Sequence, residues 1–261
     1  VGKVAGELPA IPSDLTQYAT RNNQLALSAL NQIKDSIEQA KSQFGADRIA
    51  VVIGTSTSGI SDGEAAFKHK LAHGEFPEHY HYSKQELGNT SEFVRQHSAL
   101  TGPSYAISTA CSSSGRVFLT AQRLLDSGMA DAVLVGGVDT LCKLTLNGFH
   151  GLEALSTTHC KPFSATRDGI NIGEAAAFML LSKAKLVGVN TTPNTSNIAL
   201  LGCGDSSDAH HISAPHPEGN GAEQAMIKAL DSAQLRAEDI GYINAHGTAT
   251  PLNDSMESKA I

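Results

Sequence analysis

Long apolar runs are missing from this sequence, and no stretch approaches the ~20 residues that a membrane-spanning helix needs. The first residues, from Val1 to Glu7, lack the apolar core of a secretory signal. Tryptophan is absent, and no low-complexity tract or short repeat interrupts the chain. These absences argue against a membrane-spanning, fibrous or disordered protein.

Basic residues and cysteines are also scarce. The 19 lysines and arginines are outnumbered by 26 aspartates and glutamates, a formal charge of −7 that argues against nucleic acid or an anionic membrane as the main partner. The four cysteines, Cys111, Cys142, Cys160 and Cys203, show neither C-x-x-C pairing nor metal-ligand spacing with the eleven histidines. We therefore expect no metal site, and reduced thiols in a cytoplasmic setting.

What the sequence does contain is an alternation of short apolar runs and amphipathic stretches. Hydrophobic residues fill 41% of the 261 positions, enough for one large domain or two intimate halves. Buried strands are predicted at 49–53, 105–109, 132–135, 175–181, 198–201 and 240–244, and helices at 22–44, in the run ending at Leu125, at 221–233 and from Asn253 onward. This order predicts an α/β protein with mostly parallel sheets covered by helices.

A soft linker at 189–196 divides the chain into two predicted parts, residues 1–188 and 197–261. Because the first methionine is Met129 and the last residues read as an unfinished helix, we expect a segment of a longer chain. Between His69 and His81, histidines recur in a polar, aromatic context that predicts a surface loop or lid. Solvated histidines are the preferred interpretation there, ahead of a metal site.

Cys111 is the sharpest chemical feature. It lies where a predicted strand ends and a predicted helix begins, followed by three serines that favour a helix start. The free N–H groups and partial positive charge of a helix N-terminus favour thiolate over thiol, which lowers a cysteine pKa below its usual ~8.5. The same N–H groups can hold a thioester oxygen as it gains charge. Cys111 is thus a candidate acyl-accepting nucleophile, and a buried small hydrophobe is the alternative.

His246 lies in the second such feature, Asn244-Ala-His-Gly-Thr-Ala-Thr-Pro251, at the end of a predicted parallel strand. Sites in α/β sheets usually form at such ends. A neutral imidazole can donate one N–H to a carbonyl oxygen, and the hydroxyls of Thr248 and Thr250 can bind the amides of a narrow ligand. A loop histidine satisfied by backbone is the alternative. Since 135 positions separate Cys111 from His246, their proximity is a prediction.

Together these stretches resemble the β-ketoacyl-acyl-carrier-protein synthases of the elongating, condensing type, and the resemblance covers nearly the whole chain. It is carried, in family order, by Thr109-Ala-Cys-Ser-Ser-Ser114, Gly136-Gly-Val-Asp139, Lys161-Pro-Phe-Ser-Ala-Thr-Arg-Asp-Gly169 with Gly173-Glu-Ala-Ala176, Ser207-Asp-Ala-His-His-Ile-Ser-Ala-Pro215, and the His246 motif. Any one motif is a modest signal, but five in order are specific.

The resemblance implies a thiolase-like α/β fold, layered α-β-α-β-α with mostly parallel mixed sheets, whose second half is incomplete here. It implies a decarboxylative Claisen condensation of a cysteine-bound acyl group with a malonyl thioester, in fatty acid or polyketide-type synthesis, with no cofactor. The implied partner is an acyl carrier protein bearing phosphopantetheine-linked acyl and malonyl groups, and the implied assembly is a homodimer. Lys68 and Lys70 are candidate carrier contacts, although a solvated face is the preferred interpretation.

By position, the resemblance makes Cys111 the acylated nucleophile and His246 the first of two histidines that stabilise the decarboxylating malonyl thioester. The remaining implied roles are phosphopantetheine binding for Ser213, Thr248 and Thr250, an acyl-pocket wall for Phe149, and support of the histidine for Asp254 and Glu257. An ordinary charged helix start is the alternative for the two acids, and plain core packing for Phe149. The second histidine, an active-site lysine and a glycine-rich loop are expected beyond residue 261, and a first strand before Val1.

Three other functions stay open. A thiolase-type acyltransferase shares the fold, but the His-Gly-Thr-Ala-Thr stretch argues against it. A non-catalytic partner subunit resembling a chain-length factor would typically lack Cys111. A cysteine hydrolase would lose its acyl group rapidly to water, whereas a synthase holds that group until the malonyl carrier arrives.

Overall fold

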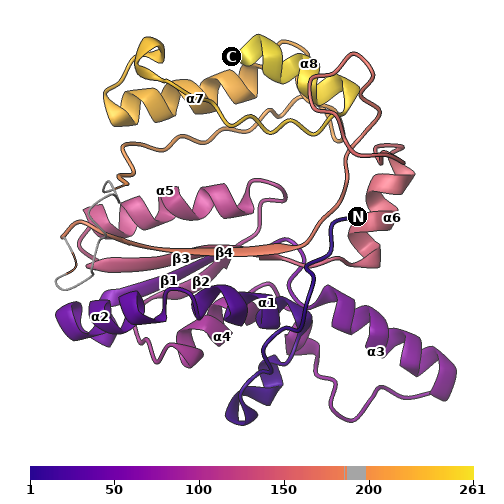
Figure 1. Cartoon of the computed structure of the whole chain (residues 1–261), viewed down its shortest axis with the longest axis vertical. Helices are drawn as coiled ribbons and strands as arrows, with labels where there is room; N and C mark the ends of the chain where they lie inside the picture. The colour runs from indigo at the N-terminus through magenta and orange to yellow at the C-terminus, as the bar shows by residue number, and fades with distance from the viewer. Residues whose placement is uncertain (185, 187–197) are drawn as a thin grey trace. The chain divides into compact units, whose positions relative to one another are not determined.

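The computed structural model describes residues 1–184, 186 and 198–261, and the predicted linker at 189–196 lies outside them (Figure 1). The chain forms two compact units. One contains Gly2–Leu146 together with the strand segment that begins at Gly173, and the other contains Asn147–Ile172 with the C-terminal part of the chain. The segment 147–172 thus groups with the C-terminal part, whereas the predicted division places it in the N-terminal part.

The first unit is built on a four-stranded sheet. Its strands are β1 (Ile49–Gly54), β2 (Ser104–Ile107), β3 (Ala132–Asp139) and β4 (Ala175–Ser182), in the order β2-β1-β3-β4. β1 pairs in parallel with β2 and β3, and β4 closes the other edge antiparallel to β3. Every residue of β1 is buried, which explains its unbroken apolar sequence. The strands predicted in this unit are confirmed, with boundaries shifted by a few residues.

Helices cover both faces of this sheet (Figure 1). Helix α5 (Ser113–Asp126) packs on one face, where Val117 and Ala121 meet Ala50 and Val52. The opposite face carries α1 (Arg21–Leu30), α2 (Lys34–Phe44) and α4 (Asn89–His97), which bury the alternate residues of β1. Because successive side chains of a strand point to opposite faces, β1 contributes to both cores. Each large aliphatic side chain so buried stabilises the fold by ~1.5–3 kcal/mol.

Two local predictions for this unit are wrong. The helix predicted over 22–44 is two helices, because α1 ends at Leu30 and the N-cap of α2, Ile33, has a non-helical φ of −118°. The loop predicted from His69 begins later, since α3 (Ile60–His73) continues to His73 and ends at Gly74 in the left-handed conformation. Short 3-10 helices complete the unit at Ser13–Tyr18, Ala46–Arg48 and Tyr82–Gln85.

The second unit contains α7 (Asn220–Ala233), a 3-10 helix at Ala237–Asp239 and α8 (Pro251–Ala260), while α6 (Lys143–Gly151) begins in the first unit and ends in this one. The strands predicted at 198–201 and 240–244 are not formed, because no strand within 198–261 pairs with them. The residues just after the first segment pass α7 closely, and a Cβ on Gly204 would lie 2.2 Å from the carbonyl oxygen of Ala225. Within the described residues, therefore, only one sheet of the expected layered architecture is formed.

Within the described residues, no helix combines the length and apolar character required to cross a bilayer.

Candidate active site

Cys111 lies on a sharp elbow between a strand and a helix, as predicted. β2 ends at Ile107, Ala110 adopts a left-handed φ of 52°, and α5 begins at Ser113. A positive φ is uncommon for a residue with a side chain, so this turn holds Cys111 in a constrained position. Cys111 is exposed, unlike the buried Cys142 and the partly buried Cys160 and Cys203. The nucleophile candidate is therefore not sealed in apolar packing.

Two serines fix the elbow from within. The Ser113 hydroxyl accepts a hydrogen bond from the Thr109 N–H at 2.9 Å and donates to the Ala110 carbonyl at 2.6 Å. The Ser112 hydroxyl donates to the Thr109 carbonyl at 2.8 Å. The backbone N–H groups of Ser112 and Ser113 also donate to these two carbonyls, at 3.3 and 3.1 Å. The expectation that the N–H groups at this helix start are free for a thioester oxygen is thus wrong for these two, because the elbow uses them.

Glycines let the start of α5 approach the sheet closely. A Cβ on Gly54, the last residue of β1, would lie 2.5 Å from the carbonyl of Ser113. A Cβ on Gly137 in β3 would lie 2.0 Å from the Ser114 hydroxyl. Neither distance is sterically possible, so these two positions require glycine while the helix keeps its place. The position of Cys111 therefore depends on strand residues far from it in sequence.

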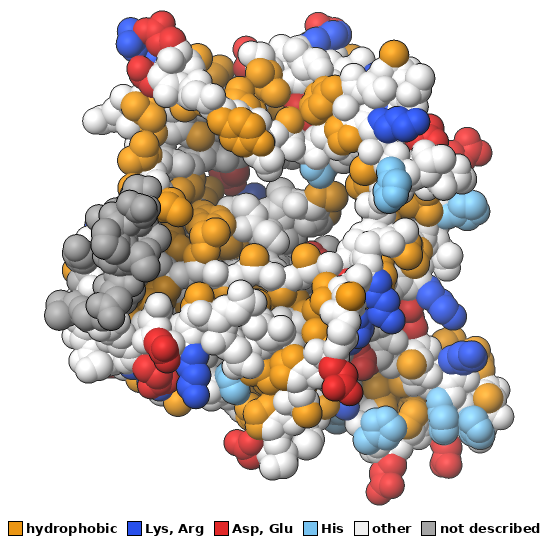
Figure 2. Space-filling view, in the orientation of Figure 1, with side chains coloured by type: hydrophobic (Ala, Val, Ile, Leu, Met, Phe, Trp, Pro, Cys, Tyr) orange, Lys and Arg blue, Asp and Glu red, His pale blue; other side chains and the backbone are white. Residues whose placement is uncertain are grey.

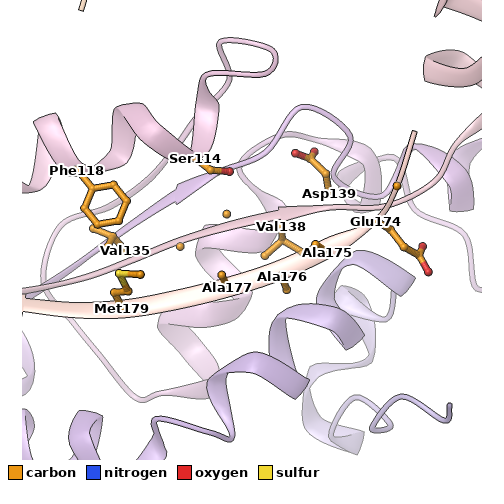
Figure 3. A pocket seen from close by; sticks show the side chains of 13 residues that line it. Ser114, Phe118, Val135, Val138, Asp139, Glu174, Ala175, Ala176, Ala177 and Met179 are labelled. Carbon is orange, nitrogen blue, oxygen red and sulfur yellow. The ribbon is translucent and has the colours of Figure 1, made fainter. Parts of the chain in front are cut away.

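A cavity of about 410 Å³ lies beside the start of α5 (Figure 3). Phe118, Val135 and Met179 surround its apolar end, and Asp139 and Glu174 lie at the opposite end. Both carboxylates already have partners. Asp139 Oδ1 accepts from the N–H groups of Ser56 and Thr57 at 2.8 and 2.9 Å, and Glu174 pairs with Arg21. The two carboxylates at this end of the cavity therefore stabilise the fold of the first unit.

In the second unit, Glu257 fixes the backbone around His246. Its Oε1 accepts a hydrogen bond from the His246 N–H at 2.5 Å, and its Oε2 accepts one from the Gly247 N–H at 2.8 Å. Gly247 has a left-handed φ of 53°. His246 itself is exposed. One carboxylate on α8 thus holds two consecutive amides of the histidine loop.

Asp254, one turn earlier on α8, clamps two other segments. Its Oδ1 accepts from the Ala249 N–H at 3.1 Å and its Oδ2 from the Phe163 N–H at 2.6 Å. Arg167 Nε lies 3.8 Å from the same carboxylate, and the Gly169 N–H donates to the Ala249 carbonyl at 3.0 Å. The side chain of Asp254 is buried. The Lys161–Gly169 motif and the histidine motif are therefore joined through one carboxylate.

The remaining candidates belong to the same unit. The hydroxyls of Thr248 and Thr250 lie 2.8 Å apart and are hydrogen-bonded to each other. Ser213 is exposed, and its N–H donates to His211 Nδ1 at 3.2 Å. Phe149 is partly buried on α6. The structure thus brings together the two threonines, His246 and the two acids, while the approach of Cys111 to His246 stays a prediction.

Several residues of these networks were not predicted. Arg167 and Phe163 lie in a recognised motif, but nothing in the sequence indicates that they meet Asp254. Gly54 carried a weak signal as a glycine that ends a buried strand. Its proximity to Ser113 depends on the packing of α5, which a local pattern does not report.

Comparisons with known proteins agree with this geometry. The family model "Beta-ketoacyl synthase, N-terminal domain" matches residues 11–186, and "Beta-ketoacyl synthase, C-terminal domain" matches residues 198–261. The chain therefore belongs to the β-ketoacyl synthase family. A curated relative, 3-oxoacyl-[acyl-carrier-protein] synthase 2 of Staphylococcus aureus, is 32% identical over 256 residues, which cover 93% of this chain and 62% of the relative.

Solved structures extend the comparison to the fold. A chain from the structure of the ketosynthase ApeO in complex with its chain length factor ApeC, from Xenorhabdus doucetiae, matches with a TM-score of 0.90 and 46% identity over 99% of this chain and 63% of that one. AntDE:AntF, a type II polyketide synthase acyl-carrier protein in complex with its ketosynthase bound to the hexaketide, matches at 0.79 and 25% identity over 95% and 64%. The predicted thiolase-like fold is confirmed, and the chain spans less than two thirds of these relatives.

Proposed function

We propose that this chain carries the nucleophile and the first histidine of a β-ketoacyl-acyl-carrier-protein synthase. The observation that carries the proposal is the exposed thiol of Cys111 on a strained elbow at the start of α5. Partial positive charge at a helix start stabilises an anion there, whether thiolate or developing oxyanion. Family membership and the 46% identity to a chain of a ketosynthase–chain length factor complex support the same reaction class.

The first step is acyl transfer to Cys111. The thiolate attacks the carbonyl carbon of an acyl thioester on a carrier protein, and a new C–S bond forms as the tetrahedral intermediate collapses. The phosphopantetheine thiolate leaves and takes up a proton. Thr248, Thr250 and Ser213 are the proposed contacts of the phosphopantetheine arm, and Phe149 is the proposed wall of the acyl pocket. The paired threonine hydroxyls support this role, since each can exchange its partner for an amide of the arm.

The second step is condensation. A malonyl thioester loses carbon dioxide, and the electron pair of the broken C–C bond becomes an enolate whose oxygen His246 hydrogen-bonds. This bond strengthens as charge develops, so it lowers the barrier. The enolate carbon attacks the acyl carbonyl, Cys111 leaves as thiolate, and a β-ketoacyl thioester results. Asp254 and Glu257 are the proposed positioning residues, because they hold the backbone from His246 to Ala249.

The proposed partner is an acyl carrier protein, which the names of the compared proteins support. For the assembly we propose a two-subunit ketosynthase. The homodimer expected from the sequence is one form, and pairing with a chain-length-factor subunit, as recorded for ApeO and ApeC, is the other. Light scattering of the chain, alone and after co-expression with such a subunit, distinguishes them. The four cysteines form no disulfide within the described residues, which supports the proposed cytoplasmic location.

Acyl loading tests the proposal. The protein is incubated with an acyl thioester and analysed by intact-mass and peptide mass spectrometry. We expect one acyl group on Cys111, no loading in Cys111→Ala, and unchanged loading in the matched control Cys160→Ala. Persistence of the acyl-enzyme until malonyl carrier is added separates a synthase from a cysteine hydrolase. Acylation at Cys111 excludes a non-catalytic, chain-length-factor-like subunit, and condensation without decarboxylation indicates a thiolase-type acyltransferase.

A further inference from the structure

The connection between β3 and α6 is held by side chains from other elements. β3 ends at Asp139, and the N–H of the next residue, Thr140, donates to the Thr57 hydroxyl at 2.9 Å. The N–H of Leu141 donates to Glu174 Oε2 at 3.4 Å. α6 therefore begins at the end of a connection that is itself fixed to the first unit.

Glu64 on α3 supplies acceptors for the first turn of α6. Its Oε2 accepts from the Lys143 N–H at 2.9 Å, and its Oε1 accepts from the Leu144 N–H at 2.8 Å. The first amides of a helix have no acceptor within the helix, and a carboxylate there also meets the partial positive charge of the helix start. The first turn of α6 contains no acidic residue of its own. Figure 2 shows acidic and basic side chains side by side at the surface where α3 meets α6 in Figure 1. A carboxylate of α3 thus caps α6.

The sequence of α6 gives it little stability of its own. The helix is 9 residues long, and none of its residues is buried. It contains Gly148 and ends at Gly151, and a Cβ on Gly148 would meet nothing within 4 Å, so this glycine does not serve close packing. A glycine inside a helix costs ~1 kcal/mol relative to alanine, and helices this short are marginal without outside support. The position of α6 therefore depends on how its start is held.

The part of α3 that carries Glu64 is packed in place. A Cβ on Gly59, just before α3, would lie 2.1 Å from the carbonyl oxygen of Lys84, and a Cβ on Gly63 would lie 2.2 Å from Gln85 Oε1. Both contacts are made with the 3-10 helix at Tyr82–Gln85. Gly63 directly precedes Glu64 and is buried. The carboxylate therefore reaches the start of α6 from a fixed support.

We propose that Glu64 is a positioning residue that governs acyl-chain selectivity through Phe149. Phe149 follows Lys143 on the same helix, about 9 Å further along its axis. This inference rests on the proposed function, in which Phe149 is a wall of the acyl pocket. A helix held at its start keeps that wall in place, whereas a helix released there lets the wall yield to a longer acyl chain. Glu64 acts in this role without touching the substrate.

Competition between a long and a short acyl thioester for Cys111 tests the inference, with the two acyl-enzymes resolved by intact-mass spectrometry. In Glu64→Gln a donor group replaces one acceptor oxygen, so one N–H of α6 loses its partner. We expect the ratio of long-chain to short-chain loading to rise about fivefold, the effect of one lost hydrogen bond, while the rate of short-chain loading stays within about twofold of the parent. Phe149→Ala should shift the ratio in the same direction. Glu78→Gln, an exposed change in the loop after α3, is the control and should keep the parent ratio.

The double variant, Glu64→Gln with Phe149→Ala, separates positioning from a general loss of stability. If Glu64 acts through Phe149, the double variant should have the ratio of Phe149→Ala alone. A further rise in the double variant, or the parent ratio in Glu64→Gln, would overturn the inference and leave the proposed function intact. A parent that accepts no acyl group would instead refute the proposed function, and the parent ratio in Phe149→Ala would remove Phe149 from the pocket. Either of these two results overturns the inference as well.

Discussion

Gly54 and Ser113 are in van der Waals contact through backbone atoms alone, with no room for a methyl group between them. A Cβ on Gly54 would lie 2.5 Å from both the carbonyl carbon and the carbonyl oxygen of Ser113. Gly54 ends β1, and Ser113 begins the helix that follows Cys111. The nucleophile candidate is thus positioned by a residue with no reactive chemistry.

Gly54→Ala should therefore move the start of α5. Since the obstructing atoms are backbone, the strain cannot relax through a side chain, and we expect a loss of ~1–3 kcal/mol in the free energy of unfolding. Alkylation of Cys111 by iodoacetamide should slow several-fold as the elbow shifts. The control is Gly148→Ala, within α6, where a Cβ would meet nothing within 4 Å. Parent-like stability and alkylation in Gly54→Ala would show that the contact does not position Cys111.

Asp254→Asn should destabilise the second unit although it changes little in volume. Both carboxylate oxygens accept backbone N–H groups, from Ala249 and Phe163. An amide offers only one acceptor, so its NH₂ group would face one of these donors. We expect a loss of ~1–3 kcal/mol, the cost of one buried unsatisfied donor, measured by urea unfolding. Ser255→Ala, an exposed change on the same helix, should have little effect, and equal losses in both variants would refute the clamp.

Glu257→Gln should loosen the histidine loop while leaving the nucleophile intact. One of the two amides, His246 or Gly247, loses its acceptor. We expect that amide to exchange hydrogen roughly five- to tenfold faster, equivalent to ~1 kcal/mol. In the complete enzyme, condensation should slow while acyl loading on Cys111 continues. Equal slowing of both steps would contradict a role confined to the His246 loop.

The sequence predicted the elements whose pattern is local. β1 and β3 were found because buried parallel strands are unbroken apolar runs, and α5 because an amphipathic stretch follows a clear start. The break between α1 and α2 was missed, because the apolar spacing continues through Asn31 to Ile33 while the backbone does not. The strand predicted at 240–244 failed for another reason. A strand needs a hydrogen-bonding partner, and periodicity does not supply one.

The residues of the candidate site also fall into those that the sequence could indicate and those that it could not. Cys111 and His246 could be named as candidates from the residue types around them, although the strand predicted before His246 is not formed. The contacts of Asp254 with Phe163 and Ala249 join positions 91 and 5 residues away, so spacing alone indicated only the shorter one. No side-chain pattern in the sequence indicates that the backbone of Gly54 approaches that of Ser113. Long-range backbone contacts of this kind become visible only in three dimensions.

Glu174 should make the stability of the first unit depend on acid. Its side chain is fully buried and accepts hydrogen bonds from Arg21 at 2.5 and 3.0 Å and from the Val4 N–H at 3.1 Å. The hydrogen bonds from Arg21 hold the pKa of this carboxyl below its ordinary value of 4.5, against the effect of burial. The folded state therefore binds this proton less readily than the unfolded chain. Its stabilisation is complete above the unfolded pKa and is lost as the pH falls through the folded one.

Glu174→Gln removes this dependence. At pH 7 we expect a loss of ~1–3 kcal/mol, because the Arg21 guanidinium loses its ionic partner while the amide oxygen still accepts one bond. Below pH 4.5 the parent should lose stability faster than the variant, so the two curves of unfolding free energy against pH should converge. Asp131→Asn breaks the solvent-exposed pair with Arg48 and is the control, for which only a small effect is expected. Parallel curves for parent and Glu174→Gln would mean that another carboxylate controls the acid response, and that Arg21 does not hold Glu174 ionised.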